Sequence, residues 1–405
     1  CCRLHSSLIM LIRSPLAQYI TVTASYWAFT LTDGALRMLV LLFFHGLGYS
    51  PLEIASLFLL YEFFGILTNL YGGWLASRIG TVYCMQLGLG LQILSLGMLL
   101  AEQSQLTVIY VMAAQALSGV AKDLNKMSAK SSIKTLMPDS EQGRLYRWVA
   151  MLTGSKNALK GLGFFLGGAL LASLGFRGSL LAMILLLLPI MLIGSLILQN
   201  QPDTRRQKFS ESLSKSPAIN WLSLARLFLF CSRDLWFVVA LPVFLHSQLQ
   251  WSHIEVGTLM ASWVIAYGAV QALAPRITGQ QQRLPNPQGL EYWALLLTLI
   301  PAAIALGLYI NVSPSYTLIG GLLLFGAVFA INSSMHSYLI VAFAQRDAVS
   351  LDVGFYYMAN AGGRLLGTVL SGLLYQQFGL ISCLLASSLM ISLSVLACRG
   401  LAKSI

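Results

Sequence analysis

Four lysines recur at four-residue spacing in a segment that otherwise has the composition of a membrane-spanning helix. They are Lys122, Lys126, Lys130 and Lys134. Residues four apart drift by about 40° per step around a helix, so the lysines form a slanted stripe. We expect Lys122 and Lys126 to lie deep and the other two to extend toward the lipid headgroups. A cation in lipid costs between about 3 and 17 kcal/mol, so this stripe must face a bundle interior or a water-filled path.

Cations outnumber carboxylates at membrane depth. Eight basic residues fall there: Arg37, Lys122, Lys126, Lys156, Lys160, Arg226, Arg233 and Arg364. Four acids fall at comparable depth: Asp33, Glu62, Asp123 and Asp234. Eight minus four leaves an excess of four positive charges, which favours an anionic ligand. Lys supplies a flexible point charge and Arg a planar fork, so a phosphorylated or carboxylated small molecule fits best.

The predicted substrate-binding residues are these cations together with two neighbouring amides. The full set is Arg37, Lys122, Asn125, Lys126, Lys156, Asn157, Lys160, Arg226, Arg233 and Arg364. Asp33 and Arg37 are four apart, and we expect them to pair on one helix face. Arg233 and Asp234 are adjacent and point about 100° apart, so we expect each to pair across helices.

Transport coupled to protons requires a group that can take up and release one. The candidates at membrane depth are Asp33, Glu62, Asp123, Asp234 and His336. Each of them can equally be a structural group whose charge or hydrogen bonds are satisfied inside the protein.

The composition is that of an integral membrane protein. Of the 405 residues, 57% are hydrophobic and only 10% are charged. Soluble domains carry about 25% charged residues. The net charge of +11 would suggest nucleic acid as the partner of a soluble chain. No basic segment with interleaved aromatic residues is present, so we expect no nucleic-acid partner.

Twelve apolar segments have about the length that a helix needs to cross the hydrocarbon layer. They lie near 18–44, 51–76, 81–100, 106–133, 144–174, 178–199, 218–246, 254–275, 290–311, 315–344, 350–377 and 379–399. Helices satisfy their own backbone hydrogen bonds, so the prediction is an all-α membrane protein. The domains expected are a tail (1–17), a six-helix bundle (18–199), a linker (200–217), a second six-helix bundle (218–400) and a short tail (401–405).

The two predicted bundles repeat weakly in sequence. Asp33 and His45 in the first span match Asp234 and His246 in the seventh. Lys160-x-x-Gly163 matches Arg364-x-x-Gly367, and Gly175 matches Gly379. Six spans separate the copies, so both start on the same side of the membrane. Such a parallel, pseudo-symmetric repeat resembles the architecture of the major facilitator superfamily.

Basic residues between the spans set the orientation. With the N-terminus inside, twelve fall on the cytoplasmic side: Arg3, Arg13, Arg78, Arg205, Arg206, Lys208, Lys215, Arg276, Arg283, Arg346, Arg399 and Lys403. Only Arg177 then falls in an outer loop. The positive-inside rule therefore predicts that both termini are cytoplasmic, in a multi-pass protein of the cytoplasmic (inner) membrane.

Signatures of catalysis are missing from the sequence. It holds no Walker A segment, no His-Glu-x-x-His and no Gly-x-Ser-x-Gly, so we expect no enzyme and no ATP-driven pump. The six cysteines have no metal-ligand spacing, and we expect no metal or other cofactor. No cleavable signal peptide is apparent, and we expect translation to start at Met10 rather than to include residues 1–9.

Several polar segments inside the predicted spans resemble one particular family. Gly73–Gly80 resembles the cytoplasmic loop motif of the major facilitator superfamily, although Ser77 stands where Asp is usual. The segments that resemble the organoarsenical efflux permeases called ArsJ are Tyr26–Arg37, Glu62–Gly65, Ala121–Lys130, Gly154–Lys160 and Arg233–Pro242. This resemblance extends over nearly all of the chain from about Gln18.

The resemblance to ArsJ implies a specific cargo. It implies proton-driven export of 1-arseno-3-phosphoglycerate, an unstable ester that a partner glyceraldehyde-3-phosphate dehydrogenase makes from arsenate. Such export would confer arsenate resistance. This cargo carries a phosphate and an arsenate, in agreement with the charge count. Two alternatives remain open: an importer or exchanger of ordinary organophosphates with the same fold, and a membrane sensor that binds an anion without transporting it.

Overall fold

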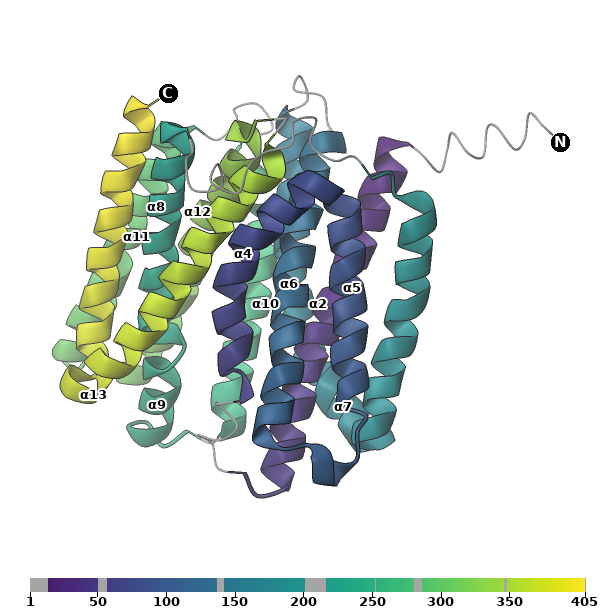
Figure 1. The fold of residues 1–405 in the computed structure, drawn as a ribbon. Coiled ribbons are helices and arrows are strands. Elements are labelled where there is room, and N and C mark those ends of the chain that lie inside the picture. Colours follow the sequence, from purple (N-terminus) through teal and green to yellow (C-terminus); the bar gives the residue numbers. More distant parts are fainter. Residues whose placement is uncertain are drawn as a thin grey trace. The chain divides into compact units, whose positions relative to one another are not determined.

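The described part of the protein is helical throughout. The computed structural model describes residues 14–49, 57–136, 142–200, 216–251, 253–279, 286–345 and 348–404. Within these ranges the chain contains helices and turns and no strand (Figure 1). This confirms the predicted all-α class. Most of the predicted tail 1–17 and linker 200–217 lies outside the described residues.

The helices of the first half of the chain are long. They are α2 (Pro15–Gly46), α4 (Leu59–Ile79), α5 (Thr81–Met98), the short 3-10 helix η1 (Gln103–Gln105), α6 (Val108–Leu136) and α7 (Gln142–Ile197). The second half has α8 (Pro217–Phe237), α9 (Ala240–Ser247), α10 (His253–Ile277), α11 (Pro287–Tyr309), α12 (Pro314–Phe343) and α13 (Val349–Lys403). Eight helical segments of the described chain are long and apolar enough to cross a membrane; α8 and α9 together form one of them.

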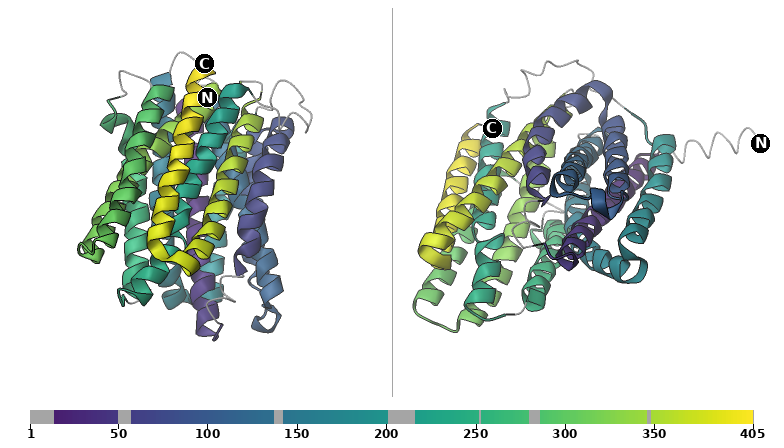
Figure 2. Two further views of the ribbon diagram at one scale, coloured as in Figure 1. Left: turned by 90° about the vertical axis from the view of Figure 1, so that its left-hand side faces the viewer. Right: turned by 60° about the horizontal axis from the view of Figure 1, so that its bottom comes forward.

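Two glycines kink the longest helices. Gly175 in α7 has φ 68° and Gly379 in α13 has φ 74°, which interrupts each helix and divides it into two. Such positive φ values favour glycine because it lacks a Cβ atom. The kink of α13 is visible where its two arms diverge in Figures 1 and 2. The sequence match between Gly175 and Gly379 therefore corresponds to the same backbone feature in both halves.

The chain forms two compact units. Unit 1 consists of Cys1–Leu145, Leu159–Ser214 and Ala344–Phe355, and unit 2 consists of Tyr146–Ala158, Lys215–Phe343 and Tyr356–Ile405. They differ from the predicted bundles in two segments, 146–158 and 344–355. The first packs closely on α10, where the backbone of Gly154 meets Gly268. The second packs on α4, where Gly354 meets Gly73.

Each unit has its own apolar core. In unit 1, Phe29, Leu36 and Phe44 of α2 are buried together with Leu180 of α7. In unit 2, the rings of Trp236, Trp263 and Phe325 meet edge to face or close to it, with Trp236 5.0 Å from Phe325 and 5.9 Å from Trp263. These cores hold the helices that carry the charged residues described below.

Two adjacent glycines in α13 provide a test of helix packing in unit 2. A Cβ atom on Gly363 would lie 2.1 Å from the Leu227 carbonyl oxygen of α8, whereas one on Gly362 would meet nothing within 4 Å. We expect Gly363→Ala to lower the free energy of unfolding by about 1–3 kcal/mol through overpacking. Gly362→Ala is the matched control, and its free energy of unfolding should rise by about 0.5–1 kcal/mol because alanine has the higher helix propensity.

The measurement is thermal unfolding of both variants in one detergent. Equal melting temperatures for Gly363→Ala and Gly362→Ala would contradict the close approach of α13 to α8.

Candidate functional site

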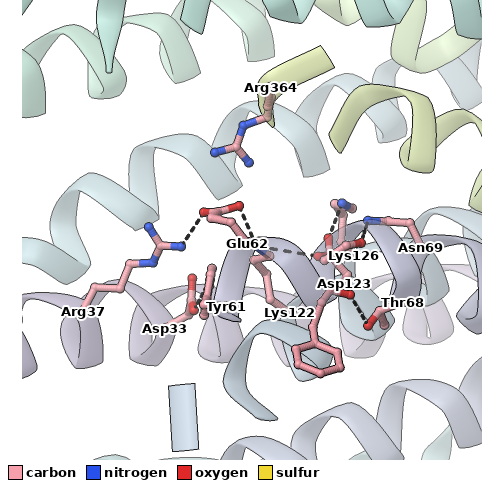
Figure 3. Close-up of polar contacts among 12 residues, drawn as sticks. Asp33, Arg37, Tyr61, Glu62, Thr68, Asn69, Lys122, Asp123, Lys126 and Arg364 are labelled. Atoms are coloured by element: carbon pink, nitrogen blue, oxygen red, sulfur yellow. Dashed lines mark hydrogen bonds and ion pairs between the residues drawn. The ribbon is translucent and has the colours of Figure 1, made fainter. Parts of the chain in front are cut away.

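Unit 1 contains a network of charged side chains from α2, α4 and α6 (Figure 3). The Arg37 guanidinium donates to Glu62 Oε1 at 2.8 Å. Lys122 Nζ lies 3.6 Å from Glu62 Oε2 and 3.6 Å from Asp123 Oδ2, and it thus bridges two carboxylates. Lys126, one turn further along α6, pairs with Asp123 Oδ1. The network therefore connects all three of these helices.

Tyr61 supports the same network from α4. Its hydroxyl donates to Asp33 Oδ1 at 2.6 Å. Its ring lies 4.0 Å from the Arg37 guanidinium carbon and 3.9 Å from Lys122 Nζ, within the range of a cation–π interaction. The predicted Asp33–Arg37 pair is wrong about both partners, because Asp33 accepts from Tyr61 and Arg37 pairs with Glu62.

The charges of this network balance within unit 1. Three cations (Arg37, Lys122 and Lys126) stand against three carboxylates (Asp33, Glu62 and Asp123), so the net charge is zero. Glu62 is the most accessible of the paired acids, with 39% of its side chain exposed against 3% for Asp123. A cargo anion that binds here must compete with a carboxylate already in place.

Other residues of the α6 stripe lie elsewhere in unit 1. Asn125 is fully buried, donates to the Ala121 carbonyl of its own helix and packs against Gly88 of α5. Lys130 and Lys134 are only 2% and 4% exposed, so the prediction that they extend to the headgroups is wrong. The reason is that α6 packs against α2, α4 and α5, which bury it over most of its length.

A second charged cluster lies in unit 2 and is centred on Asp234 of α8. The Arg233 guanidinium donates to Asp234 Oδ1 at 2.6 Å, and Arg364 of α13 donates to Asp234 Oδ2 at 3.2 Å. We predicted that Arg233 and Asp234 would each pair across helices. That is correct for Asp234 with Arg364, but wrong for Arg233, whose flexible side chain turns back to its neighbour. Asp234 is completely buried and both its oxygens are occupied.

Arg226, two turns before Arg233 in α8, is held by neutral groups. Its Nε donates to Asn360 Oδ1 at 2.9 Å, and its Nη1 donates to the carbonyl oxygen and the hydroxyl of Ser333 at 3.2 and 3.0 Å. The guanidinium carbon lies 3.9 Å from the centre of the Phe230 ring. Arg226 is 3% exposed. A buried guanidinium with neutral partners retains its full positive charge and attracts an anion.

The Ser333 hydroxyl connects Arg226 to a chain of amides. Gln271 Nε2 donates to Ser333 Oγ at 3.1 Å, and Asn157 Nδ2 donates to Gln271 Oε1 at 2.7 Å. The Tyr267 hydroxyl also lies 3.1 Å from Ser333 Oγ. Asn157 was a predicted binding residue, and it is linked to Arg226 through this chain.

Sequence reasoning missed Ser333, Gln271, Tyr267 and Asn360. The signal that could have found Ser333 is the polar run Asn332-Ser-Ser-Met-His-Ser337 inside the apolar helix α12, in which each polar residue is fully buried. His336 belongs to this run, one turn after Ser333. In the described part of the chain neither of its ring nitrogens has a hydrogen-bond partner.

The remaining predicted cations lie on α7. Lys156 belongs to unit 2 and Lys160 to unit 1, and both are partly buried. In the cluster of unit 2, three guanidiniums (Arg226, Arg233 and Arg364) stand against the single carboxylate of Asp234, which leaves two positive charges.

No group of three or more His, Cys, Asp or Glu side chains in the described ranges could hold a metal ion. The charged groups of both units are paired with one another or with neutral hydrogen-bond partners. Guanidinium and ammonium groups of this kind can also form charge-assisted hydrogen bonds to phosphate or carboxylate groups.

Comparison with known proteins defines the class. A family model described as the Major Facilitator Superfamily matches residues 22–285. The chain therefore belongs to this superfamily of multi-pass membrane transporters, which are generally not enzymes, and it has the all-helical fold of that superfamily. No curated protein matches the chain.

Solved structures are similar over nearly the whole chain. The human organic anion transporter MFSD10 (TETRAN) has a TM-score of 0.75 and 17% identity, over 95% of this chain and 99% of its own. The E. coli fucose:proton symporter FucP has a TM-score of 0.74 and 12% identity, over 96% and 99%. A bacterial homologue of the iron transporter ferroportin, in an outward-facing state, has a TM-score of 0.73 and 14% identity, over 95% and 98%. At these identities the similarity shows the fold alone.

Proposed function

We propose that this chain is a secondary active transporter that exports an anionic organic molecule bearing a phosphate or arsenate group. The proposal depends on Arg226, whose buried guanidinium has only neutral hydrogen-bond partners among the contacts described. The carboxylate of Asp234, in the same helix, already accepts from Arg233 and Arg364. Arg226 is buried, and Arg233 and Arg364 are partly buried, so the two net positive charges of this cluster favour a counter-ion. An anionic cargo would supply that counter-ion each time it binds.

The proposed architecture has twelve membrane spans with both termini in the cytoplasm. The kinks at Gly175 and Gly379 divide α7 and α13 into two segments each, and α8 and α9 together form one segment. Counted in this way, the described helices support the twelve predicted spans. The excess of basic residues between spans supports the orientation and a place in the cytoplasmic membrane. The domain boundaries after 199 and before 218 remain part of this proposal.

The proposed binding residues are the ten predicted from the sequence, and the proposed coupling ion is a proton. Of the five coupling candidates, Glu62 combines an ion pair to Arg37 with partial exposure, and His336 combines complete burial with two unsatisfied nitrogens. Asp33, Asp123 and Asp234 are each engaged by donors inside one unit.

The proposed cargo is 1-arseno-3-phosphoglycerate. Its identity depends on the resemblance of the charged helical segments to ArsJ, since arsenate and phosphate are too alike in shape and charge to be distinguished by these sites. The proposal includes a functional link to a glyceraldehyde-3-phosphate dehydrogenase that makes the ester. The outcome for the cell would be arsenate resistance.

Arsenate resistance of a sensitive bacterium that expresses the chain together with the dehydrogenase tests this proposal. We expect Lys126→Ala and Lys160→Ala to abolish resistance, because each removes a cation from the proposed binding set. Exposed Lys403 provides the control, and Lys403→Ala should retain full resistance. Immunoblots of membranes must show equal amounts of each variant. Full resistance with both Lys126→Ala and Lys160→Ala would contradict the assignment of the binding residues.

A further inference from the structure

The Ser333 hydroxyl is approached by more donors than it can satisfy. Arg226 Nη1, Gln271 Nε2 and the Tyr267 hydroxyl lie 3.0, 3.1 and 3.1 Å from its oxygen. A serine hydroxyl has two lone pairs to accept with and one proton to donate. Arg226 and Gln271 have no acceptor role at these nitrogens, so they take both lone pairs. Tyr267 is placed as a third donor to this oxygen, and its contact with Ser333 is satisfied only when the serine proton points at the Tyr267 oxygen instead.

In this arrangement the hydroxyl proton of Tyr267 has no described acceptor. Once Tyr267 Oη accepts from Ser333, its own O–H has to point away from Ser333 and needs another acceptor. Tyr267 is 5% exposed, so bulk water is a poor substitute. An unsatisfied buried donor is costly, and the phenol therefore favours a ligand that brings an acceptor atom.

A second buried phenol points to the same requirement. Tyr356 of α13 is fully buried, and in the described part of the chain its hydroxyl has no hydrogen-bond partner. Its ring centre lies 5.3 Å from the Arg226 guanidinium carbon. Arg226 uses Nε for Asn360 and Nη1 for Ser333, which leaves Nη2 as a further donor. Unit 2 thus gathers two phenolic protons and the two N–H groups of Arg226 Nη2 with no described acceptor.

We infer that Tyr267, Tyr356 and Arg226 form an oxyanion-binding subsite in unit 2, which takes the tetrahedral phosphate or arsenate end of the cargo. This inference rests on the proposed function and assigns that end of the cargo to specific donors. A tetrahedral oxyanion offers several acceptor oxygens at once and a negative charge for the guanidinium. A cation would be repelled by Arg226, and a neutral hydroxyl compound would leave its charge uncompensated.

Gln271 and Asn157 act as positioning residues in this subsite. Asn157 donates to the Gln271 carbonyl oxygen, which fixes the amide so that its nitrogen faces Ser333. Ser333 in turn orients both Arg226 and Tyr267. The chain of amides therefore determines which way the Tyr267 proton points without contacting the ligand itself.

Binding of inorganic phosphate and of 3-phosphoglycerate to the full-length protein in lipid nanodiscs tests the subsite. We expect Tyr267→Phe and Tyr356→Phe each to weaken the binding of both probes by about 10- to 100-fold, the value of a hydrogen bond to a charged group. Tyr110→Phe is the matched control, because its hydroxyl donates to the Met98 carbonyl in unit 1. It should bind both probes as the wild type does.

Thermal stability separates a binding role from a structural one. The Tyr356 hydroxyl has no described partner, so Tyr356→Phe should melt at or above the wild-type temperature while it loses affinity. A lower melting temperature with unchanged affinity would overturn the subsite. Wild-type affinity in both phenylalanine variants would also overturn it and would leave the proposed anion transport intact. If the wild type binds neither probe, the proposed function fails together with the subsite.

Discussion

Replacing Arg226 with glutamine should reduce the initial rate of cargo export by about 30- to 4,000-fold. Truncating a buried, hydrogen-bonded charge at a binding site costs about 2–5 kcal/mol, and each 1.4 kcal/mol is a factor of ten. Glutamine can still bond to Asn360 or Ser333, so the fold of unit 2 should persist. The loss therefore reports on charge rather than on packing.

Two further substitutions sharpen this prediction. Arg226→Lys keeps the charge but loses the planar fork that reaches Asn360 and Ser333, and we expect about a tenfold loss. Arg399→Gln is the control in the same unit, since Arg399 is half exposed and pairs with Glu291 at 2.7 Å. It should export at the wild-type rate. Equal rates for Arg226→Gln and Arg399→Gln would exclude Arg226 from cargo binding.

Asp234→Asn should destabilise the protein strongly in the absence of anions. Asp234 is the described carboxylate that pairs with both Arg233 and Arg364, and its loss raises the charge of this cluster from two to three. Removing one partner of a buried ion pair costs about 3–5 kcal/mol. The melting temperature of the purified variant should therefore fall well below that of the wild type.

An anion should restore part of this stability. A ligand at 100 times its Kd adds about 2.7 kcal/mol to the folded state. Because the variant has more uncompensated charge, phosphate or 3-phosphoglycerate should raise its melting temperature more than that of the wild type. Sodium chloride at equal ionic strength is the control for general screening. If the anions stabilise the variant no more than chloride does, then the cluster is a structural ion pair only.

The sequence predicted the class of fold because that depends on composition. Long apolar segments require helices, and breaker residues separate them. The pairing of Gly175 with Gly379 was visible as a repeat and corresponds to two kinks with nearly the same φ. The excess of cations was also a matter of counting, although the structure buries Lys130 and Lys134 as well, which that count left out.

The partners of the charges could not be predicted, because they depend on which helices are neighbours. Spacing along α2 favoured Asp33 with Arg37, but α4 brings Glu62 to Arg37 and Tyr61 to Asp33. Both partners are about 25 residues away in sequence, and local periodicity has no information about them. The same limit explains Lys130 and Lys134, whose burial depends on the helices that pack around α6.

The neutral part of the unit 2 site was missed for a different reason. Ser333, Gln271 and Tyr267 are ordinary residues of membrane helices when taken singly. They are uncharged, so a count of charges does not include them. Only their convergence on one hydroxyl, from α10 and α12, distinguishes them from groups that hold helices together. Such convergence is a property of three-dimensional structure alone.

Export of arsenic into everted membrane vesicles tests the central claim most directly. Arsenate, glyceraldehyde-3-phosphate, NAD and purified glyceraldehyde-3-phosphate dehydrogenase are added to vesicles that contain the wild type or Arg226→Gln, with and without a proton gradient. We expect arsenic to accumulate only with the wild type and only with all components present, and we expect an uncoupler to abolish the accumulation. No accumulation of arsenic, together with uptake of 3-phosphoglycerate alone, would contradict the claim and would identify an ordinary organophosphate carrier.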